Sequence, residues 1–280
     1  MGSNKDRGVG SMNRWISLLI GLWLALAACG GQNVASNATA TTAAIRWSET
    51  VAPQGIDVPG AQWLKIEGAG GKSNNLQLAA VLRPAAAGTF PLVVWLHGSD
   101  GTLLTDATAA SQLSAGGFVV LVGCWKFTPE SADLIRGIPV PRIPCLQNLA
   151  STDDAIQALI EVGQQLPGVK KGAIGTFGVS AGGPLALQLT ATRSDIGAVV
   201  VDSSLRGPAK VSAPVLILGG TADLTISAES QQTYEQALRD SGTTVEAHYY
   251  EGGMHGVAEM GDFQVDAIKR MIDFYGRYLK

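Results

Sequence analysis

Eight short apolar runs, separated by segments with helical spacing, constrain the fold of this 280-residue chain more than any other feature. Several of these runs, such as Leu92–Leu96, show no alternation of apolar and polar residues, which is typical of strands that are buried on both faces. The eight predicted strands are Gln62–Ile66, Leu76–Leu82, Leu92–Leu96, Phe118–Val122, Ala173–Phe177, Ala198–Val201, Val215–Leu218 and Val245–Tyr250.

Helical patterns separate the later runs, with serines at Ser151 and Ser227 placed to cap two of the helices. Strands that alternate with helices predict an α/β fold: a doubly wound, mostly parallel eight-stranded sheet with helices on both faces. Ligand sites in such sheets lie beyond the carboxyl ends of the strands, so functional residues are expected directly after the apolar runs. The predicted helices are Asp153–Gln164, Pro184–Ala191, Ser227–Asp240 and Val265–Leu279.

The composition narrows the range of functions. The formal net charge is −3 and only 15% of the residues are charged, so no basic surface for nucleic acid is expected. A hydrophobic fraction of 46% in a chain of this length favours one large folded domain over disorder. The few histidines and cysteines are scattered, so we expect no metal and no cofactor.

The first 28 residues have the pattern of a secretory signal: basic residues, then a short uncharged apolar run, then small residues. The run ends in the sequence LAAC, with Cys29 last, which resembles the lipobox of bacterial lipoproteins. This resemblance implies lipid on Cys29 and an extracytoplasmic protein anchored to a bacterial membrane. The alternatives are an ordinary cleaved signal with an incidental cysteine, or an uncleaved anchor. Residues 29–48 are expected to form a flexible tether, and residues 49–280 the folded domain.

Ser180 is the candidate nucleophile, in the sequence GVSAGG at residues 178–183. A match to G-x-S-x-G is weak by itself in a chain with 35 glycines. The position strengthens it, because the motif lies between a predicted buried strand and a predicted helix. Flanking glycines allow the strained turn that exposes such a serine, whereas a simple Gly-Ser loop fits this context poorly.

A serine nucleophile needs a base and an orienting carboxylate. His255 follows the last predicted strand, whereas His248 lies inside it, so His255 is the predicted base. Asp223 follows the seventh strand and is the predicted acid; Asp202, after the sixth strand, is the alternative. The chain order serine, aspartate, histidine is the order of the α/β-hydrolases.

From Pro91 onward the chain resembles an α/β-hydrolase of the dienelactone-hydrolase-like branch. The matching segments are Leu96–Gly101, Phe177–Gly183, Ala213–Asp223 and Tyr250–Gly256. The last two are also similar to the catalytic domain of prolyl-oligopeptidase relatives. Dienelactone hydrolases proper carry a cysteine nucleophile, so the serine at this position favours a general carboxylesterase.

An oxyanion hole is expected beside the nucleophile. One donor is the N–H of Ala181, and the family pattern His-Gly-x implies the N–H of Ser99 as the other, with Gly98 or Asp100 as alternatives. We interpret the His97 imidazole as a structural group that hydrogen-bonds this loop.

The pocket wall is expected to come from residues 125–145, including Trp125 and Phe127, with a proline-pinned surface loop as the alternative. The link Ser203–Pro214 is too short for a large cap domain. Cys124 and Cys145 could staple the wall as a disulfide or remain two unpaired small hydrophobic residues.

These features predict a serine hydrolase that cleaves small-molecule carboxylic esters through an acyl-enzyme. The alternatives are a serine peptidase or acyl-aminoacyl-type amide hydrolase, and a non-catalytic binding lipoprotein. The sequence predicts no oligomeric state.

Overall fold

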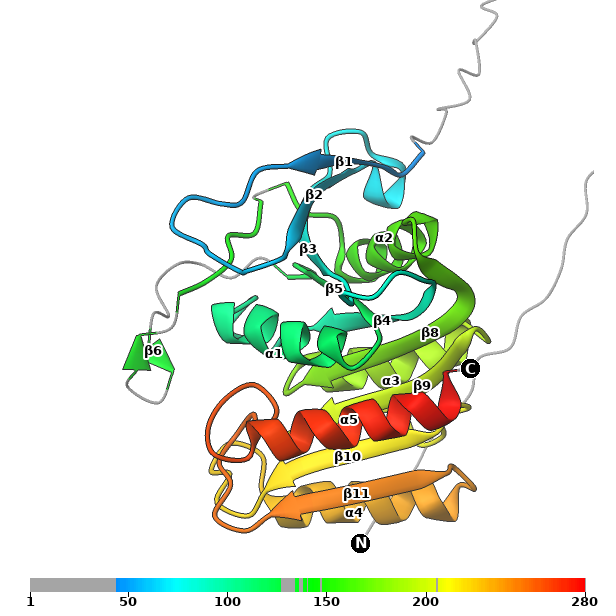
Figure 1. Cartoon of the computed structure of the whole chain (residues 1–280). Coiled ribbons are helices and arrows are strands. Elements are labelled where there is room, and N and C mark those ends of the chain that lie inside the picture. Colours follow the sequence, from blue (N-terminus) through cyan, green and yellow to red (C-terminus); the bar gives the residue numbers. More distant parts are fainter. Residues whose placement is uncertain are drawn as a thin grey trace, which may run out of the picture. The chain divides into compact units, whose positions relative to one another are not determined.

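The computed structural model describes residues 44–126, 134–135, 138–139, 141–146, 148–204 and 206–279 (Figure 1). The predicted signal segment, Cys29 and most of the predicted tether lie outside these residues. The main sheet consists of β1 (Arg46–Thr50), β2 (Gln62–Glu67), β3 (Leu76–Leu82), β4 (Phe90–Leu96), β5 (Val119–Gly123), β8 (Val169–Val179), β9 (Ile196–Asp202), β10 (Val215–Gly220) and β11 (Val245–Tyr250).

The sheet has nine strands in the order β1-β2-β3-β5-β4-β8-β9-β10-β11. The first three strands pair antiparallel with their neighbours, and every pair from β5 to β11 is parallel. All eight predicted strands are present. The predicted count was wrong by one, because β1 forms the edge beside β2. The tether boundary at residue 48 was also wrong, since β1 begins at Arg46.

In the part of the chain that the structure describes, five helices cover the sheet: α1 (Leu104–Ala115), α2 (Thr152–Gln165), α3 (Gly182–Thr192), α4 (Ala228–Asp240) and α5 (Gln264–Tyr278). Helices α1 and α5 pack on one face, and α2, α3 and α4 on the other (Figure 1). Side chains that alternate along a strand give the sheet two apolar faces, as β4 illustrates. Leu92, Val94 and Leu96 belong to the core cluster on one face, while Val93 and Trp95 belong to the cluster on the other. The doubly wound fold is therefore confirmed.

Two helices have the serine N-caps that the sequence predicts. The Ser151 hydroxyl accepts a hydrogen bond from the Asp154 amide at 3.4 Å, and Ser227 accepts one from the Ser230 amide at 3.2 Å. The remaining short elements are the 3₁₀ turn η1 (Ala69–Gly71) and a two-stranded hairpin of β6 (Leu134–Ile135) and β7 (Ile138–Pro139).

Helix α1 was not predicted, because its alanine- and serine-rich sequence lacks an apolar stripe. A buried carboxylate anchors it instead. Asp106 accepts hydrogen bonds from the Leu103 amide at 2.6 Å and from the Trp95 indole at 2.8 Å. Small side chains then let the helix approach the sheet closely.

The loops at the carboxyl ends of the parallel strands vary in length. Strand β9 ends at Asp202 and β10 begins at Val215, which leaves no room for a large cap domain between them. Within the described ranges, no helix combines the length and apolarity that crossing a bilayer would need.

Candidate active site

One pocket lies at the carboxyl ends of the parallel strands, where the sequence predicts a site. Its volume is about 310 Å³, and both Ser180 and His255 line it. The loops after β4, β8, β10 and β11 all contribute to it, although they are far apart in the chain. The described lining residues are Gly98, Ser99, Asp100, Gly101, Leu103, Val179, Ser180, Thr225, His255, Glu259 and Met260.

Ser180 occupies the sharp turn between β8 and α3. Its φ of 50° lies in the left-handed region, which is strained for a residue with a side chain. Its amide donates to the Asp202 carbonyl at 3.0 Å, and its carbonyl accepts from the Gly183 amide at 3.1 Å.

Both glycines of the motif are required by close approach. A Cβ atom at Gly178 would collide with the Gly182 carbonyl, and a Cβ at Gly182 would collide with the Leu96 carbonyl. The motif therefore folds as the strained turn that the sequence predicts.

The strain at Ser180 predicts a stability difference between two variants. Ser180→Gly is expected to have a free energy of unfolding about 1 kcal/mol higher than Ser180→Ala, because only glycine adopts this φ without cost. Chemical denaturation of both variants measures the difference. The same pair at Ser230, exposed in α4, is the control and should show the opposite order, since alanine is favoured inside a helix. Equal stabilities of the two Ser180 variants would contradict the strain.

His255 forms a hydrogen bond from its Nδ1 to Asp223 Oδ2 at 2.8 Å. The Asp223 side chain is fully buried, whereas 26% of the side chain of His255, which lines the pocket, is exposed. The second oxygen of Asp223 accepts the amides of Thr225 at 2.8 Å and Ile226 at 2.9 Å. These two bonds lock the carboxylate in the orientation that meets the imidazole.

The loops that carry Asp223 and His255 are tied together by their backbones. The Ala222 amide donates to the Gly253 carbonyl at 2.8 Å, and the Gly252 amide donates to the Thr221 hydroxyl at 2.8 Å. The approach at Gly220 leaves no space for a Cβ atom against the Gly253 backbone. Gly220, the last residue of β10, thus lets the two loops come into contact.

Asp202, the alternative acid, does not make this contact. It is fully buried, and its carboxylate accepts from the Ser203 hydroxyl at 3.0 Å and from the Ala258 amide at 2.7 Å. Burial raises the pKa of Asp202 to about 6. His248, which was set aside as a base, lies within β11 with its ring edge against Tyr250, at 4.4 Å between ring centroids.

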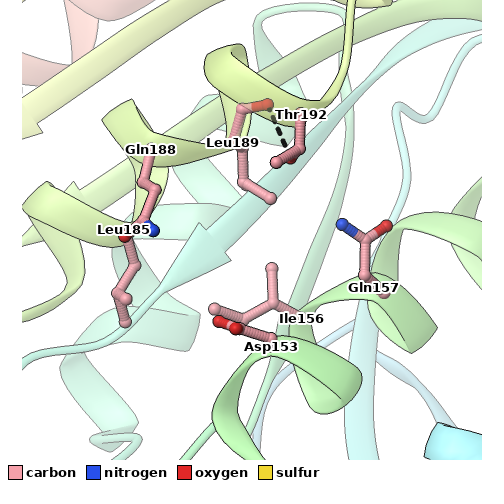
Figure 2. A pocket seen from close by; sticks show the side chains of 7 residues that line it. All are labelled: Asp153, Ile156, Gln157, Leu185, Gln188, Leu189 and Thr192. Atoms are coloured by element: carbon pink, nitrogen blue, oxygen red, sulfur yellow. Dashed lines mark hydrogen bonds between the residues drawn. The ribbon is translucent and has the colours of Figure 1, made fainter. Parts of the chain in front are cut away.

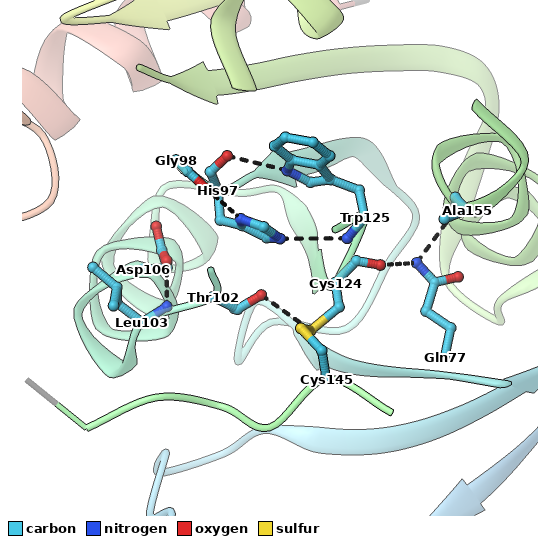
Figure 3. The surroundings of a disulfide bond; sticks show 10 residues. All are labelled: Gln77, His97, Gly98, Thr102, Leu103, Asp106, Cys124, Trp125, Cys145 and Ala155. Carbon is cyan, nitrogen blue, oxygen red and sulfur yellow. Dashed lines mark hydrogen bonds between the residues drawn. A yellow bond between two sulfur atoms is a disulfide. The ribbon is translucent and has the colours of Figure 1, made fainter. Parts of the chain in front are cut away.

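His97 braces the loop after β4 (Figure 3). Its Nδ1–H donates to the Gly98 carbonyl at 2.7 Å, and its Nε2 accepts from the Trp125 amide at 3.3 Å. These contacts agree with the structural role that the sequence predicts for the imidazole. The loop passes close to the nucleophile, since a Cβ at Gly98 would lie 3.5 Å from the Ser180 Cβ. Ser99 lines the pocket, and Ala181 is the N-cap residue of α3.

Burial makes His97 sensitive to acid. Removal from water lowers its pKa from 6.5 to about 4, because a buried imidazolium would be poorly solvated. In the unfolded chain this histidine binds a proton below its ordinary pKa, so its contribution to stability is complete above pH 6.5 and is lost as the pH falls toward 4.

We therefore expect the unfolding free energy of the wild type, relative to His97→Asn, to fall by about 2.5 kcal/mol between about pH 7.5 and pH 4.5. Denaturant titrations of both proteins at a series of pH values measure this difference. A difference that stays constant with pH would show that the pKa of His97 is the same in the folded and the unfolded protein.

Trp125 lies behind this loop and not in the pocket wall, so that prediction was wrong. Only 5% of the residue is exposed; its ring stacks on His97 at 4.8 Å, and its indole N–H donates to the His97 carbonyl at 3.0 Å (Figure 3). It is absent from the described lining of the pocket because these contacts turn it inward. Phe127 lies outside the described residues.

Cys124 and Cys145 form a disulfide beside Trp125 (Figure 3). The bond closes the segment that was expected to overhang the site, and the Thr102 hydroxyl lies 3.4 Å from the Cys124 sulfur. In the described part of the chain, the one group of potential metal ligands is His97 with these two cysteines. Its sulfurs are bonded to each other and offer no thiolate.

Several lining residues were not predicted. Leu103, Thr225, Glu259 and Met260 reach the pocket from loops whose sequences carry no motif. The sequence indicates only that they follow the ends of strands, and this does not distinguish a pocket residue from its neighbours in the same loop.

A second, smaller pocket of about 150 Å³ lies between α2 and α3 (Figure 2). Its described lining contains neither histidine nor cysteine. The lining residues are Asp153, Ile156, Gln157, Leu185, Gln188, Leu189 and Thr192.

The sheet order, the strained serine turn and the bonded His255–Asp223 pair define the chain as an α/β-hydrolase. More narrowly, the chain belongs to the dienelactone hydrolase family, whose model matches residues 78–279. It is thus a hydrolase by family.

Solved structures share this fold at low sequence identity. A Klebsiella pneumoniae protein described as a dienelactone hydrolase has a TM-score of 0.57 at 18% identity, covering 84% of this chain and 100% of its own. Esterase 2 of Thermogutta terrifontis has a TM-score of 0.56 at 16% identity, covering 78% of this chain and 91% of its own.

Acylaminoacyl peptidase of Pyrococcus horikoshii has a TM-score of 0.54 at 17% identity, covering 73% of this chain but only 40% of its own. No curated protein matches the chain.

Proposed function

We propose that this protein is a serine hydrolase that cleaves carboxylic esters of small molecules through an acyl-enzyme. The observation that carries the proposal is the 2.8 Å hydrogen bond between His255 and buried Asp223, in a pocket that Ser180 also lines. A strained serine and an oriented imidazole in one pocket are the arrangement that nucleophilic acyl transfer needs.

The hydrogen-bond pattern sets the proton positions. Asp223 accepts from Nδ1 of His255, so the Nδ1 atom carries the proton and Nε2 has a free lone pair. Nε2 then takes the proton of the Ser180 hydroxyl as its oxygen attacks the ester carbonyl. Asp223 stabilises the imidazolium that forms, without itself accepting the proton.

The tetrahedral intermediate carries a negative oxygen, which the N–H groups of Ala181 and Ser99 are proposed to bind. The intermediate collapses, the alcohol leaves with the proton from His255, and the acyl group remains on Ser180. Water, deprotonated by His255, attacks the acyl-enzyme and releases the acid. The cycle balances without a metal or a cofactor.

Relatives of the same fold support a serine ester hydrolase. One solved structure is that of Thermogutta terrifontis esterase 2 phosphorylated by paraoxon, and another is a dienelactone hydrolase-like promiscuous phosphotriesterase from metagenomic libraries. Organophosphorus compounds are therefore suitable probes for Ser180 in this chain. The peptidase alternative rests on the acylaminoacyl peptidase fold and is an outcome of the same test.

The location of the protein is a separate proposal. We propose that Cys29 carries lipid and anchors the protein outside the cytoplasm. The Cys124–Cys145 disulfide supports this, because such bonds persist mainly in oxidising compartments. Incorporation of labelled palmitate in a bacterial host, lost in Cys29→Ala, is the measurement that checks it.

The function is tested with the purified protein from residue 30 onward. We expect hydrolysis of p-nitrophenyl esters of graded chain length, and labelling by a fluorophosphonate that peptide mapping assigns to Ser180. A protein that neither turns over esters nor takes up the label is not a serine hydrolase. Faster cleavage of matched p-nitroanilides than of esters would replace the esterase assignment with an amidase or peptidase.

A further inference from the structure

We propose that Asp202 and Ser203 are positioning residues that hold the loop carrying His255 against the turn carrying Ser180. The inference rests on the proposed function, because it assigns these two residues a part in presenting the base to the nucleophile. Both lie at the carboxyl end of β9, between the strands that lead to the nucleophile and to the base.

Asp202 bonds to both sides of the proposed catalytic pair. Its backbone carbonyl accepts the Ser180 amide at 3.0 Å. Its carboxylate Oδ2 accepts the Ala258 amide, three residues after His255, at 2.7 Å. A single buried residue thus connects the nucleophile's backbone to the base's loop.

Ser203 completes the connection. Its hydroxyl accepts the Gly256 amide at 2.9 Å and donates to Asp202 Oδ1 at 3.0 Å. Gly256 directly follows His255, so this bond acts next to the base itself. On the other side of the histidine, the Gly253 carbonyl accepts the Ala222 amide at 2.8 Å. The backbone around His255 is therefore held on both sides.

Asp202 and Ser203 lower the stability of the fold, which argues that they are retained for the site and not for packing. Ser203 has a φ of 47°, a second strained non-glycine residue beside that of Ser180. Neither Asp202 nor Ser203 is exposed to solvent, so a carboxyl group is buried where an apolar residue would pack at lower cost. Strained and buried polar groups of this kind concentrate where a site needs fixed geometry.

Positioning is distinct from the chemistry. The Asp202 carboxylate is occupied by Ser203 and Ala258, and the His255 Nδ1 is occupied by Asp223. The pair would act by fixing the separation of the serine oxygen and the imidazole, and a displacement of about 1 Å in such a site can cost about 100-fold in rate.

Three variants test the proposal. Asp202→Ala is expected to lower kcat for a p-nitrophenyl ester by about 100-fold, with KM changed less than about twofold, because the site is misaligned and not emptied. Ser203→Ala removes the hydrogen bond to the Gly256 amide but leaves that of Asp202 to the Ala258 amide, and should lower kcat by about tenfold.

Asp202→Asn should rescue activity to within about tenfold of the wild type, since its amide oxygen can accept the Ala258 N–H and its amide nitrogen can donate to Ser203. If Asp202 were the charged partner of the base, this variant would instead lose about 10⁴-fold.

Amide hydrogen exchange supplies a readout that needs no turnover. In Asp202→Ala we expect the amides of Gly256 and Ala258 to exchange at least about tenfold faster, while amides in the distant helix α2 keep their protection. A wild type without ester turnover would defeat the proposed function, and exchange at these two amides would still decide whether the pair holds the loop.

The positioning role is overturned if Asp202→Ala keeps the wild-type kcat. It is also overturned if Asp202→Asn is as impaired as Asp202→Ala, or if exchange at Gly256 and Ala258 is unchanged. Should Asp202→Ala fail to fold, Ser203→Ala and Asp202→Asn carry the same test.

Discussion

Replacing Ser180 with alanine is expected to lower kcat for ester hydrolysis by about 10⁶-fold. The substitution removes the oxygen that forms the acyl-enzyme, and no other hydroxyl can take its place at the turn between β8 and α3. A small residual rate should remain, because His255 can still activate water and the proposed oxyanion donors are backbone N–H groups. The fold should be retained, since alanine keeps the Cβ atom and the backbone bonds of Ser180 to Asp202 and Gly183.

The measurement is turnover of a p-nitrophenyl ester at saturating substrate, together with fluorophosphonate labelling. Ser230→Ala is the matched control: it removes an exposed hydroxyl from α4 that is not part of the described pocket lining, and should leave both readouts unchanged. Loss of a true nucleophile lowers kcat by about 10⁶-fold. A Ser180→Ala protein that keeps more than about 1% of the wild-type activity would therefore show that the nucleophile is another residue.

The site could be predicted from the sequence because buried parallel strands end at one edge of the sheet. Ser180, Asp223 and His255 each follow a parallel strand, β8, β10 or β11, and each lies at that edge. Strand β1 could not be predicted, because it is an exposed edge whose pairing with β2 rests on backbone hydrogen bonds. Such bonds leave no pattern of apolar side chains.

Two other features depend on contacts that no local pattern encodes. Trp125 follows a strand end as the rule requires, but stacking on His97 turns it inward. Asp202 and Asp223 both lie at the carboxyl ends of buried strands, so this position alone does not separate their roles. Their roles diverge because Gly220 lets the Asp223 loop pack against the His255 loop, while the carboxylate of Asp202 meets the Ala258 amide and the Ser203 hydroxyl instead.

Asp223→Asn is expected to lower kcat by about 10⁴-fold while leaving the structure intact. The reason lies in the turn that holds the side chain. Oδ1 of Asp223 accepts two backbone amides, those of Thr225 at 2.8 Å and Ile226 at 2.9 Å. Only an oxygen can accept them, so the asparagine oxygen must stay there and its NH₂ group must face His255.

That orientation reverses the imidazole. The asparagine N–H donates to Nδ1 of His255, which must then be unprotonated, and the proton moves to Nε2. Nε2 is the atom that has to accept the proton of Ser180, so the base is blocked although every residue is in place. The variant should therefore bind substrate with a KM close to that of the wild type, and lose kcat.

Asp202→Asn is the matched comparison, because it makes the same chemical change one strand away. We expect it to lose about tenfold at most, since its amide can satisfy both of its neighbours. Measuring kcat for both variants with one p-nitrophenyl ester decides which carboxylate orients the base. The reverse order, a large loss at Asp202 and a small one at Asp223, would transfer that role to Asp202 and leave the 2.8 Å contact of Asp223 with His255 as a structural bond.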